Sequence, residues 1–293
     1  MKARAGDIEL AYDDLGPRDG RPLVLIMGIG AQRLLWDDAM CDAFVARGFR
    51  VIRFDSRDVG ESTYVDAPVP SPGKTLARRL VGLPIHAPYT LSDMARDVVG
   101  LLDATGIARA HVMGASLGGM VAQHLAIEHG NRLRSMTSVM STPGARRYLP
   151  EPRALRALFA PAPRSAEQAG EHAATLFQTI GSPAWPSDGE RLRRLGAEAY
   201  RRGTNPRGFL RQFAAVLASG DRAPRLGDVR VPSLIIHGSR DPMFPLSAGR
   251  AQAALIPGAT WLPIAGMGHD LPAGLWPTIV AAVAKHALRA DRA

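Results

Sequence analysis

The stretch that decides the fold is His111–His129, which reads HVMGASLGGMVAQHLAIEH. An apolar, strand-like run precedes the glycines, and a helical pattern follows them. Ser116 stands between these two patterns, two residues after Gly114 and two residues before Gly118. A sharp strand-to-helix turn needs small neighbours, because larger side chains at these positions would collide where the chain passes itself. The pattern therefore predicts a strained turn that exposes the Ser116 hydroxyl at the carboxyl end of a sheet, beside a helix N-terminus.

Strand-like and helix-like segments alternate along most of the chain. Short continuous apolar runs predict buried parallel strands, and amphipathic stretches between them predict helices. This alternation implies right-handed crossovers and a mostly parallel sheet covered by helices on both faces, which is the α/β class. The expected strands are 7–13, at an edge of the sheet, 22–27, 49–54, 110–113, 133–140, 233–237 and 260–264. The expected helices are 35–47, a short one near 76–83, 90–104, 120–129 and 275–289.

The alternation fails between Thr142 and Val231. Several prolines interrupt this segment, and only helical patterns lie between them. Because the strand pattern resumes after Val231, we interpret the segment as a helical cap inserted into one α/β domain, in preference to an independent second domain. We expect residues 1–142 and 228–293 to form the core domain and residues 143–227 to form the cap.

Asp241 is the acid candidate for a catalytic site built around Ser116. A serine nucleophile needs a base within hydrogen-bond reach and an acid that orients this base. Residues 235–242 form a strand followed at once by a glycine-containing turn, which places the Asp241 carboxylate at the sheet edge that carries Ser116. Asp221 and Asp228 precede this strand and would lie at its other end. The alternative for Asp241 is a structural role in which the carboxylate accepts N–H groups of its own turn.

His269 is the base candidate. It follows a strand and the turn Gly266–Gly268, and it comes after the acid, as a serine, acid, histidine order requires. Other histidines fit this role less well, because they lie within a helix, in a loop before the nucleophile, in the cap, or at the start or end of a strand. They are His86, His111, His124, His129, His172 and His237. We expect His237 to pack beside Asp241.

Two backbone N–H groups are expected to stabilise the oxyanion that forms when Ser116 attacks a carbonyl. One belongs to Leu117, the residue after the nucleophile. The other is expected in the glycine turn 28–30 after the first buried parallel strand, where we select Ile29. An ordinary glycine turn is the alternative for this segment.

These motifs together resemble the α/β-hydrolase superfamily over essentially the whole chain. Within it, the stretches Leu25–Gly28, Arg53–Ser62 and Ile264–His269, together with the serine turn, are similar to the aclacinomycin methylesterase group of bacterial esterases. The resemblance implies a Ser116–His269–Asp241 triad, an oxyanion hole of Ile29 and Leu117, a helical cap over the substrate and no cofactor. Met27 departs from the pattern, because many relatives carry histidine there.

We expect a hydrolase that cleaves carboxylic esters of small to medium, largely apolar substrates through an acyl-enzyme. Serine at position 116 disfavours the haloalkane dehalogenases and epoxide hydrolases of this fold, which use aspartate there. Three alternatives stay open: other triad hydrolysis at a C–C, lactone or amide bond, cofactor-free perhydrolysis, and a ligand receptor without catalysis. Apolar cap residues either line the substrate site or pack between cap helices. They are Leu155, Leu158, Phe159, Leu176, Phe177, Trp185, Phe209 and Phe213.

Composition limits the partners. The net charge is +9, and residues 144–227 hold fourteen arginines, no lysine and seven acids. These arginines fall in helical patterns, which favours solvated helix faces over nucleic-acid recognition.

No run reaches the ~18 apolar residues of a membrane span, no secretory signal opens the chain, and Cys41 has no partner for a disulfide. No paired His or Cys spacing indicates a metal, and no glycine motif indicates a nucleotide. We therefore expect a cytoplasmic enzyme with a small-molecule ester substrate, no cofactor, and no nucleic-acid or membrane partner; the sequence does not define an oligomeric state.

Overall fold

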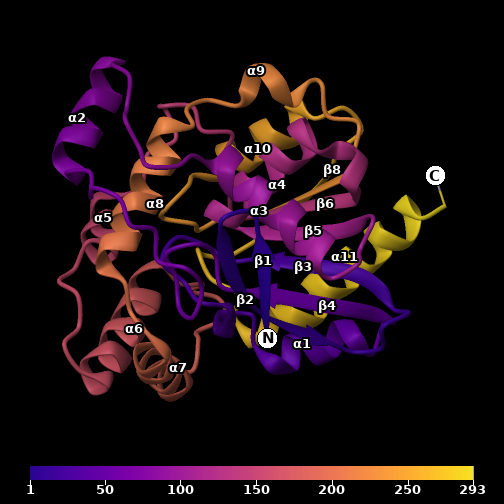
Figure 1. Ribbon diagram of the computed structural model, residues 1–293, viewed down its shortest axis with the longest axis horizontal. Coiled ribbons are helices and arrows are strands. Elements are labelled where there is room, and N and C mark those ends of the chain that lie inside the picture. The colour runs from indigo at the N-terminus through magenta and orange to yellow at the C-terminus, as the bar shows by residue number, and fades with distance from the viewer. Residues whose placement is uncertain (293) are drawn as a thin grey trace.

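The computed structural model describes residues 1–292. An eight-stranded sheet forms the centre of the molecule, with the strand order β1-β2-β4-β3-β5-β6-β7-β8 (Figure 1). The strands are β1 (Lys2–Ala5), β2 (Ile8–Leu15), β3 (Arg21–Ile26), β4 (Phe49–Phe54), β5 (Ala110–Ala115), β6 (Leu133–Val139), β7 (Ser233–Gly238) and β8 (Thr260–Ile264). The pairings from β4 to β8 are all parallel, as the alternating sequence pattern predicts.

One edge of the sheet differs from the prediction. The strand expected at residues 7–13 forms as β2, but it is not an edge strand, because β1 pairs with it antiparallel in a register that places Ala3 opposite Leu10. β2 in turn pairs antiparallel with β4. The alanines Ala3 and Ala5 of β1 are buried, and Gly100 leaves room for Ala5, because a Cβ at Gly100 would lie 2.7 Å from the Ala5 Cβ. β1 therefore covers a part of the core that β2 alone would leave open.

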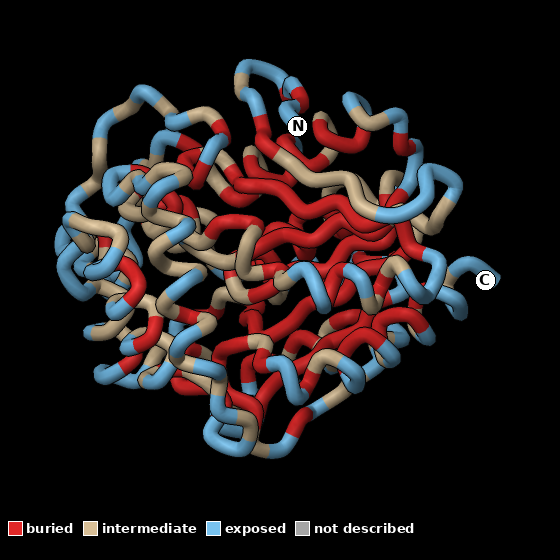
Figure 2. The backbone as a smooth tube through the Cα atoms, turned by 90° about the horizontal axis from the view of Figure 1, so that it is seen from below, coloured by how far each residue is buried: buried red, intermediate tan, exposed pale blue. Residues whose placement is uncertain are grey.

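Two apolar layers hold the sheet between its helices, and the strands are the most continuously buried part of the chain (Figure 2). Along β3, Val24 and Ile26 face one layer, and Leu23 and Leu25 face the other, as expected when side chains alternate. The first layer contains α3 (Leu91–Ala104) and α4 (Leu117–Glu128), and the second contains α1 (Asp38–Val45) and α11 (Trp276–Ala290). A further helix, α10 (Leu246–Leu255), packs on β7 and β8.

Helix ends follow local signals. The predicted helix at 90–104 forms as α3, and Thr90 and Asp93 make a reciprocal capping box at its start. The stretch expected to be one helix over 35–47 begins instead with a short 3-10 turn, Arg33–Leu35, and α1 starts only after Asp37, whose side chain accepts the N–H of Ala39. An aspartate N-cap thus sets the start of α1.

The chain between β6 and β7 forms helices, which we call the cap helices. They are α5 (Pro152–Leu158), α6 (Ala166–Ile180), α7 (Gly189–Arg202), α8 (Pro206–Ala218) and the short α9 (Ala223–Leu226). Figure 1 shows α5 to α8 together on the left, beside the sheet. α6 and α7 approach closely through small residues, since a Cβ at Gly170 would lie 2.7 Å from the Arg193 carbonyl oxygen. One more helix, α2 (Pro72–Val81), stands outside the core and packs against α8.

No helix among residues 1–292 is both long and apolar enough to cross a membrane.

Candidate active site

The turn between β5 and α4 holds Ser116 in a strained conformation. Its φ is 55° and its ψ is −116°, a positive φ that is uncommon for any residue other than glycine. A Cβ at Gly114 would overlap the carbonyl oxygen of Gly118, and a Cβ at Gly118 would overlap that of Ile26. Both glycines are therefore required by backbone contacts. The Ser116 N–H donates to the Val139 carbonyl (2.9 Å), which fixes the turn to the next strand.

Ser116, His269 and Asp241 form one chain of hydrogen-bond contacts. The His269 Nε2 lies 3.0 Å from the Ser116 Oγ, and the His269 Nδ1 lies 2.9 Å from the Asp241 Oδ2. The serine follows β5, the aspartate follows β7 and the histidine follows β8. Parallel strands bring all three loops to one edge of the sheet, as expected from the position of each residue directly after a strand. Asp241 and His269 are buried, and Ser116 is half-buried.

The Asp241 carboxylate is fixed by its own turn. Its Oδ1 accepts the backbone N–H groups of Met243 (2.8 Å) and Phe244 (3.0 Å), which leaves Oδ2 facing His269. The turn contacts proposed as an alternative for this residue are thus present together with the histidine contact. His237 lies beside the carboxylate as predicted, with its Nε2 3.5 Å from Oδ2, and burial lowers the pKa of His237.

The loop that carries His269 is bonded to the cap. The His269 N–H donates to the carbonyl of Ile180 at the end of α6 (2.7 Å), and the Gly268 N–H donates to the Ser182 Oγ (2.9 Å). The next residue, Asp270, accepts the hydroxyls of Ser182 and Ser187, both in the α6–α7 connection. Burial raises the pKa of the Asp270 carboxyl, and these two hydroxyls partly oppose that rise. The sequence does not predict these contacts between the His269 loop and the cap, because no motif near Ser182 indicates Asp270 as its partner.

The loop after β3 passes close to Ser116, because a Cβ at Gly28 would lie 3.4 Å from the Ser116 Cβ. The Gly30 N–H donates to the Gln212 Oε1 (2.8 Å), and the Ala31 N–H donates to the Gly28 carbonyl (3.3 Å). The Ile29 N–H has no acceptor within residues 1–292. Of these three N–H groups, that of Ile29 is the free one.

Gln212 was not singled out by the sequence, although it shapes this loop. It lies in α8 of the cap, is fully buried, and donates its Nε2 to the Arg57 carbonyl (2.8 Å) while Oε1 accepts from Gly30. A second glutamine, Gln32, extends from the same loop and donates to the carbonyls of Ala199 and Gly203 at the end of α7 (2.8 Å each). The two amides tie this loop to two cap helices.

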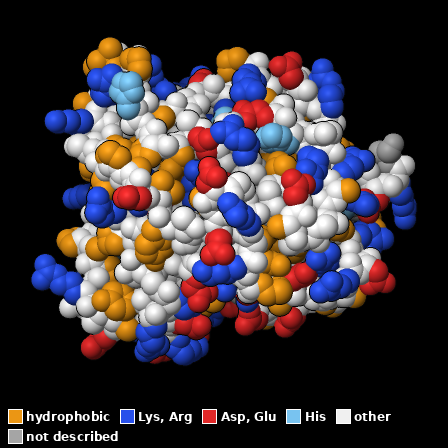
Figure 3. All heavy atoms as spheres, viewed as in Figure 1, with side chains coloured by type: hydrophobic (Ala, Val, Ile, Leu, Met, Phe, Trp, Pro, Cys, Tyr) orange, Lys and Arg blue, Asp and Glu red, His pale blue; other side chains and the backbone are white. Residues whose placement is uncertain are grey.

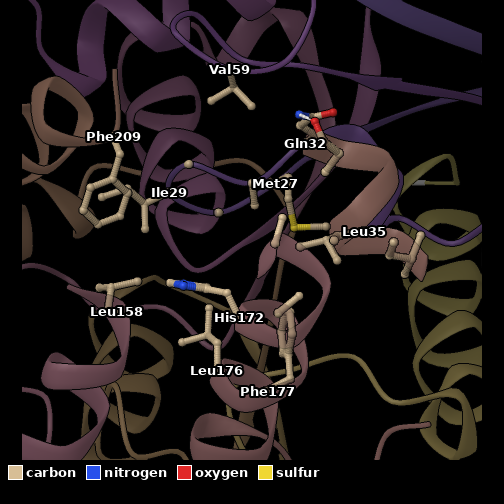
Figure 4. Close-up of a pocket in the computed structure, with 18 of the residues that line it drawn as sticks. Met27, Ile29, Gln32, Leu35, Val59, Leu158, His172, Leu176, Phe177 and Phe209 are labelled. Atoms are coloured by element: carbon tan, nitrogen blue, oxygen red, sulfur yellow. Dashed lines mark hydrogen bonds between the residues drawn. The ribbon is translucent and has the colours of Figure 1, made fainter. Parts of the chain in front are cut away.

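A cavity of about 510 Å³ lies between the cap and the sheet edge. Ser116, His269 and Ile29 border it on the core side, and its walls are mainly apolar (Figure 4). The sequence left open whether eight apolar cap residues line the site or pack between cap helices. Leu158, Phe159, Leu176, Phe177 and Phe209 line the cavity, whereas Leu155, Trp185 and Phe213 do not.

Most of the cap arginines are exposed, as expected for solvated helix faces, but Arg211 and Arg202 form ion pairs with the core. Arg211 is buried and makes a two-pronged ion pair with Asp58, with Nη2 2.6 Å from Oδ1 and Nε 2.8 Å from Oδ2. Burial alone would raise the pKa of Asp58, but hydrogen bonds from Arg211 and Tyr89 lower it. Arg202 pairs with Asp55 and Glu61 of the same loop. Asp55, Asp58 and Ser62 of this loop are buried, and part of this polar cluster joins the core to the cap.

Within the described chain, no cluster of three or more His, Cys, Asp or Glu side chains has the arrangement of a metal site. Cys41 is buried, and burial raises the pKa of its thiol to about 12, as fits a packed apolar residue.

Ser116 lies in a strained turn after a parallel strand, and an aspartate and a histidine lie at the same edge of the sheet. This arrangement is typical of the α/β-hydrolase fold. The sequence matches the alpha/beta hydrolase fold family over residues 21–272, and the chain belongs to this family. It is similar to the rhodomycin D methylesterase of Streptomyces peucetius, with 28% identity over 96% of this chain and 95% of that protein. The predicted resemblance to the aclacinomycin methylesterase group is thereby confirmed.

Solved structures show the same architecture. A hydrolase from Pseudomonas aeruginosa is 28% identical, with a TM-score of 0.70 and coverage of 100% of this chain and 98% of that chain. The enol-lactonase from Burkholderia xenovorans is 23% identical, with a TM-score of 0.72 and coverage of 98% and 99%. This second likeness concerns the fold.

Proposed function

We propose that this protein hydrolyses carboxylic esters, with Ser116 as nucleophile, His269 as general base and acid, and Asp241 as the group that orients His269. The hydrogen-bond chain from Ser116 Oγ through His269 to Asp241 Oδ2 carries this proposal. The similarity to a protein named as a methylesterase supports the choice of an ester bond.

In the proposed reaction, His269 Nε2 removes the Ser116 proton as Oγ forms a bond to the ester carbonyl carbon. The N–H groups of Ile29 and Leu117 then donate to the carbonyl oxygen as it becomes negative. Collapse of this tetrahedral species breaks the bond to the alkoxide, which takes the proton from His269. Water, deprotonated by His269, next attacks the acyl-enzyme, and the acid leaves as Ser116 regains its proton.

Different observations support the assignment of the Leu117 and Ile29 N–H groups as oxyanion donors. Leu117 is the first residue of α4, where N–H groups have no partner within the helix. The Ile29 N–H is free of acceptors within the described chain, whereas Gln212 occupies the neighbouring Gly30 N–H. We therefore assign Ile29, and not Gly30, as the second donor.

We propose a substrate that is largely apolar and larger than a simple acetate ester. The cavity of about 510 Å³ and its leucine and phenylalanine walls support this size and polarity. His172 is a polar exception on the cap wall: Figure 4 shows it extending from α6 toward the gap between Ile29 and Leu158. We assign His172 to a hydrogen bond with a polar group of the substrate away from the ester.

We also propose that residues 143–227 act as a cap unit on a core of residues 1–142 and 228–293. The contacts of Asp270, Gln212 and Arg211 support a cap that is closed over the site in this structure. Substrate entry then requires movement of the cap or a path between its helices.

The test is hydrolysis of p-nitrophenyl esters graded by acyl length, run with Ser116→Ala and with a matched control, Ser71→Ala, which changes an exposed serine at the start of α2. A fluorophosphonate probe should label the wild type and Ser71→Ala with one equivalent and leave Ser116→Ala unlabelled. Loss of turnover in Ser116→Ala alone is the expected result. Wild-type rates in a folded Ser116→Ala protein would rule out the proposed mechanism.

A further inference from the structure

One corner of the molecule, formed by residues 74–85 and 144–149, exposes an unusual amount of apolar surface. We call it the α2 corner. Leu80, Val81, Leu83 and Leu149 are 58%, 70%, 51% and 59% exposed. They are four of the seven large hydrophobic residues that are exposed among residues 1–292. On α2, Ala77, Leu80 and Val81 are spaced to share the outward helix face. Isolated exposed leucines need no explanation, but a cluster on a projecting helix indicates a binding surface.

The same corner is strongly cationic. Residues 67–92 contain no acid, and neither do residues 144–150. No carboxylate in the described chain lies within ion-pair distance of the five cations of the corner, in contrast to the paired arginines of the cap core. Arg78 and Arg79 instead donate to the backbone carbonyls of Pro84 and Gly144 (2.6 Å each). The cations are Lys74, Arg78, Arg79, Arg146 and Arg147. The corner therefore has an uncompensated positive charge.

A small cavity separates two of these arginines. It has a volume of about 210 Å³ and is lined by Arg79 and Arg146, together with Leu83, Ile85 and Leu217. Burial and the nearby Arg146 lower the pKa of Arg79, and the more distant Asp221 only partly opposes them. Two like charges facing one cavity are mutually repulsive, and an anion between them would relieve that repulsion. A phosphate group carries the charge that two facing arginines would bind, and its oxygens accept the N–H groups of guanidinium side chains.

We propose that the α2 corner binds the surface of an anionic phospholipid bilayer. Lipid phosphates would occupy the cavity between Arg79 and Arg146, and Leu80, Val81 and Leu83 would enter the boundary between headgroups and acyl chains. The shape favours a bilayer over a protein partner: α2 projects from the corner (Figure 1), and Figure 3 shows hydrophobic and cationic side chains together at the same place.

A membrane partner was not expected from the sequence, because the sequence does not show that Leu80, Val81 and Leu83 are exposed. The proposed membrane binding is independent of the proposed ester hydrolysis. The two are linked in space, however, since α2 packs against α8 and Phe209 of α8 lines the large cavity. Binding at this corner would hold the cap near a source of apolar esters.

The experiment is co-sedimentation of the full chain with vesicles of phosphatidylcholine alone or with one third phosphatidylglycerol, at low and at high salt. The expected result is binding to the anionic vesicles only, and loss of binding at high salt. Arg79→Gln with Arg146→Gln should weaken binding by about 25-fold, at about fivefold for each cation removed. Leu80→Ser with Val81→Ser should weaken binding to the anionic vesicles at low salt, although both cations are kept.

Matched controls outside the corner are Arg18→Gln and Leu288→Ser, which remove an exposed cation and an exposed leucine and should bind as the wild type does. Labelling of Ser116 by a fluorophosphonate reports that each variant is folded. Five results would overturn the proposal. They are no binding to vesicles at low salt, equal binding to neutral vesicles, unchanged binding in both double variants, binding of inorganic phosphate without binding of vesicles, and binding to an acidic protein without binding of vesicles.

Discussion

Replacing Asp241 by asparagine tests the proposed triad with little change in shape. Two backbone N–H groups, of Met243 and Phe244, donate to the Asp241 Oδ1 at 2.8 Å and 3.0 Å. In Asp241→Asn these groups still require an oxygen, so they fix the new amide with its NH₂ toward His269. The His269 Nδ1 then has to accept a hydrogen bond, and its proton moves to Nε2. An Nε2–H that faces the Ser116 hydroxyl cannot remove its proton.

The wrong tautomer of a triad histidine lowers kcat by about 10⁴, equivalent to about 5.4 kcal/mol at the transition state. Because both contacts of Oδ1 are kept, the free energy of unfolding should change by only about 1 kcal/mol. Large loss of activity with small loss of stability is therefore the expected combination. A simple disruption of the turn would instead lower both.

The assay is kcat/KM on a p-nitrophenyl ester from neutral to alkaline pH, with unfolding by urea measured in parallel. Asp228→Asn is the matched control, since Asp228 is an exposed acid before β7 and should be silent. If Asp241→Asn keeps more than a hundredth of the wild-type kcat/KM, the proposed role of Asp241 is wrong. If activity is lost only in step with stability, the tautomer argument is wrong.

Three further changes test other parts of the structure. Gln212→Leu leaves the Gly30 N–H and the Arg57 carbonyl without their buried hydrogen-bond partners. We expect urea unfolding to show about 2–5 kcal/mol lower stability, and steady-state kinetics to show a fall in kcat larger than the change in KM. An unchanged kcat would contradict a link between the Gln212 amide and the Ile29 donor. His172→Leu should raise KM for substrates with a polar group away from the ester and leave simple alkyl esters unaffected, and equal KM values for both kinds would exclude the proposed contact. Burial lowers the pKa of His111 from its ordinary 6.5 to about 4, so protonation of this side chain favours the unfolded chain. The contribution of neutral His111 to the free energy of unfolding is fully present above pH 6.5. It should fall by about 3 kcal/mol between pH 6.5 and pH 4. His111→Asn should remove that part of the slope in pH-dependent unfolding, and an unaltered slope would refute the assignment.

Most of the sheet could be predicted because its strands carry strong local patterns. The strand 260–264 has the predicted bounds, and the helix 90–104 follows its capping signals. β1 was missed because Lys2–Ala5 is short, alternates cations with alanines, and gains its burial only by packing beneath Gly100. α10 was missed for a related reason: Leu246–Leu255 has a weak apolar contrast and no side-chain cap.

The residues of the candidate site also fall into two groups: those that the sequence predicts and those that it does not. Ser116, Asp241 and His269 follow strands directly, so their places at one sheet edge could be predicted, and the structure puts them within hydrogen-bond distance. Gln212 could not be found, because its partner Gly30 lies 182 residues away and no local motif connects them. The buried state of Arg211 was missed likewise, since its helix pattern resembles that of its solvated neighbours.

The order of the strands along the chain also has a consequence for biosynthesis. Ser116 and His269 are separated by 153 residues, and β8 is the last strand to be made. At about 5–20 residues per second, a ribosome needs roughly 8–30 s to pass from the serine codon to the histidine codon. In the proposed mechanism, the nascent chain therefore holds the serine without its base throughout that interval. We expect the unfinished protein to be inactive, and activity to begin only when the end of the sheet has emerged and docked.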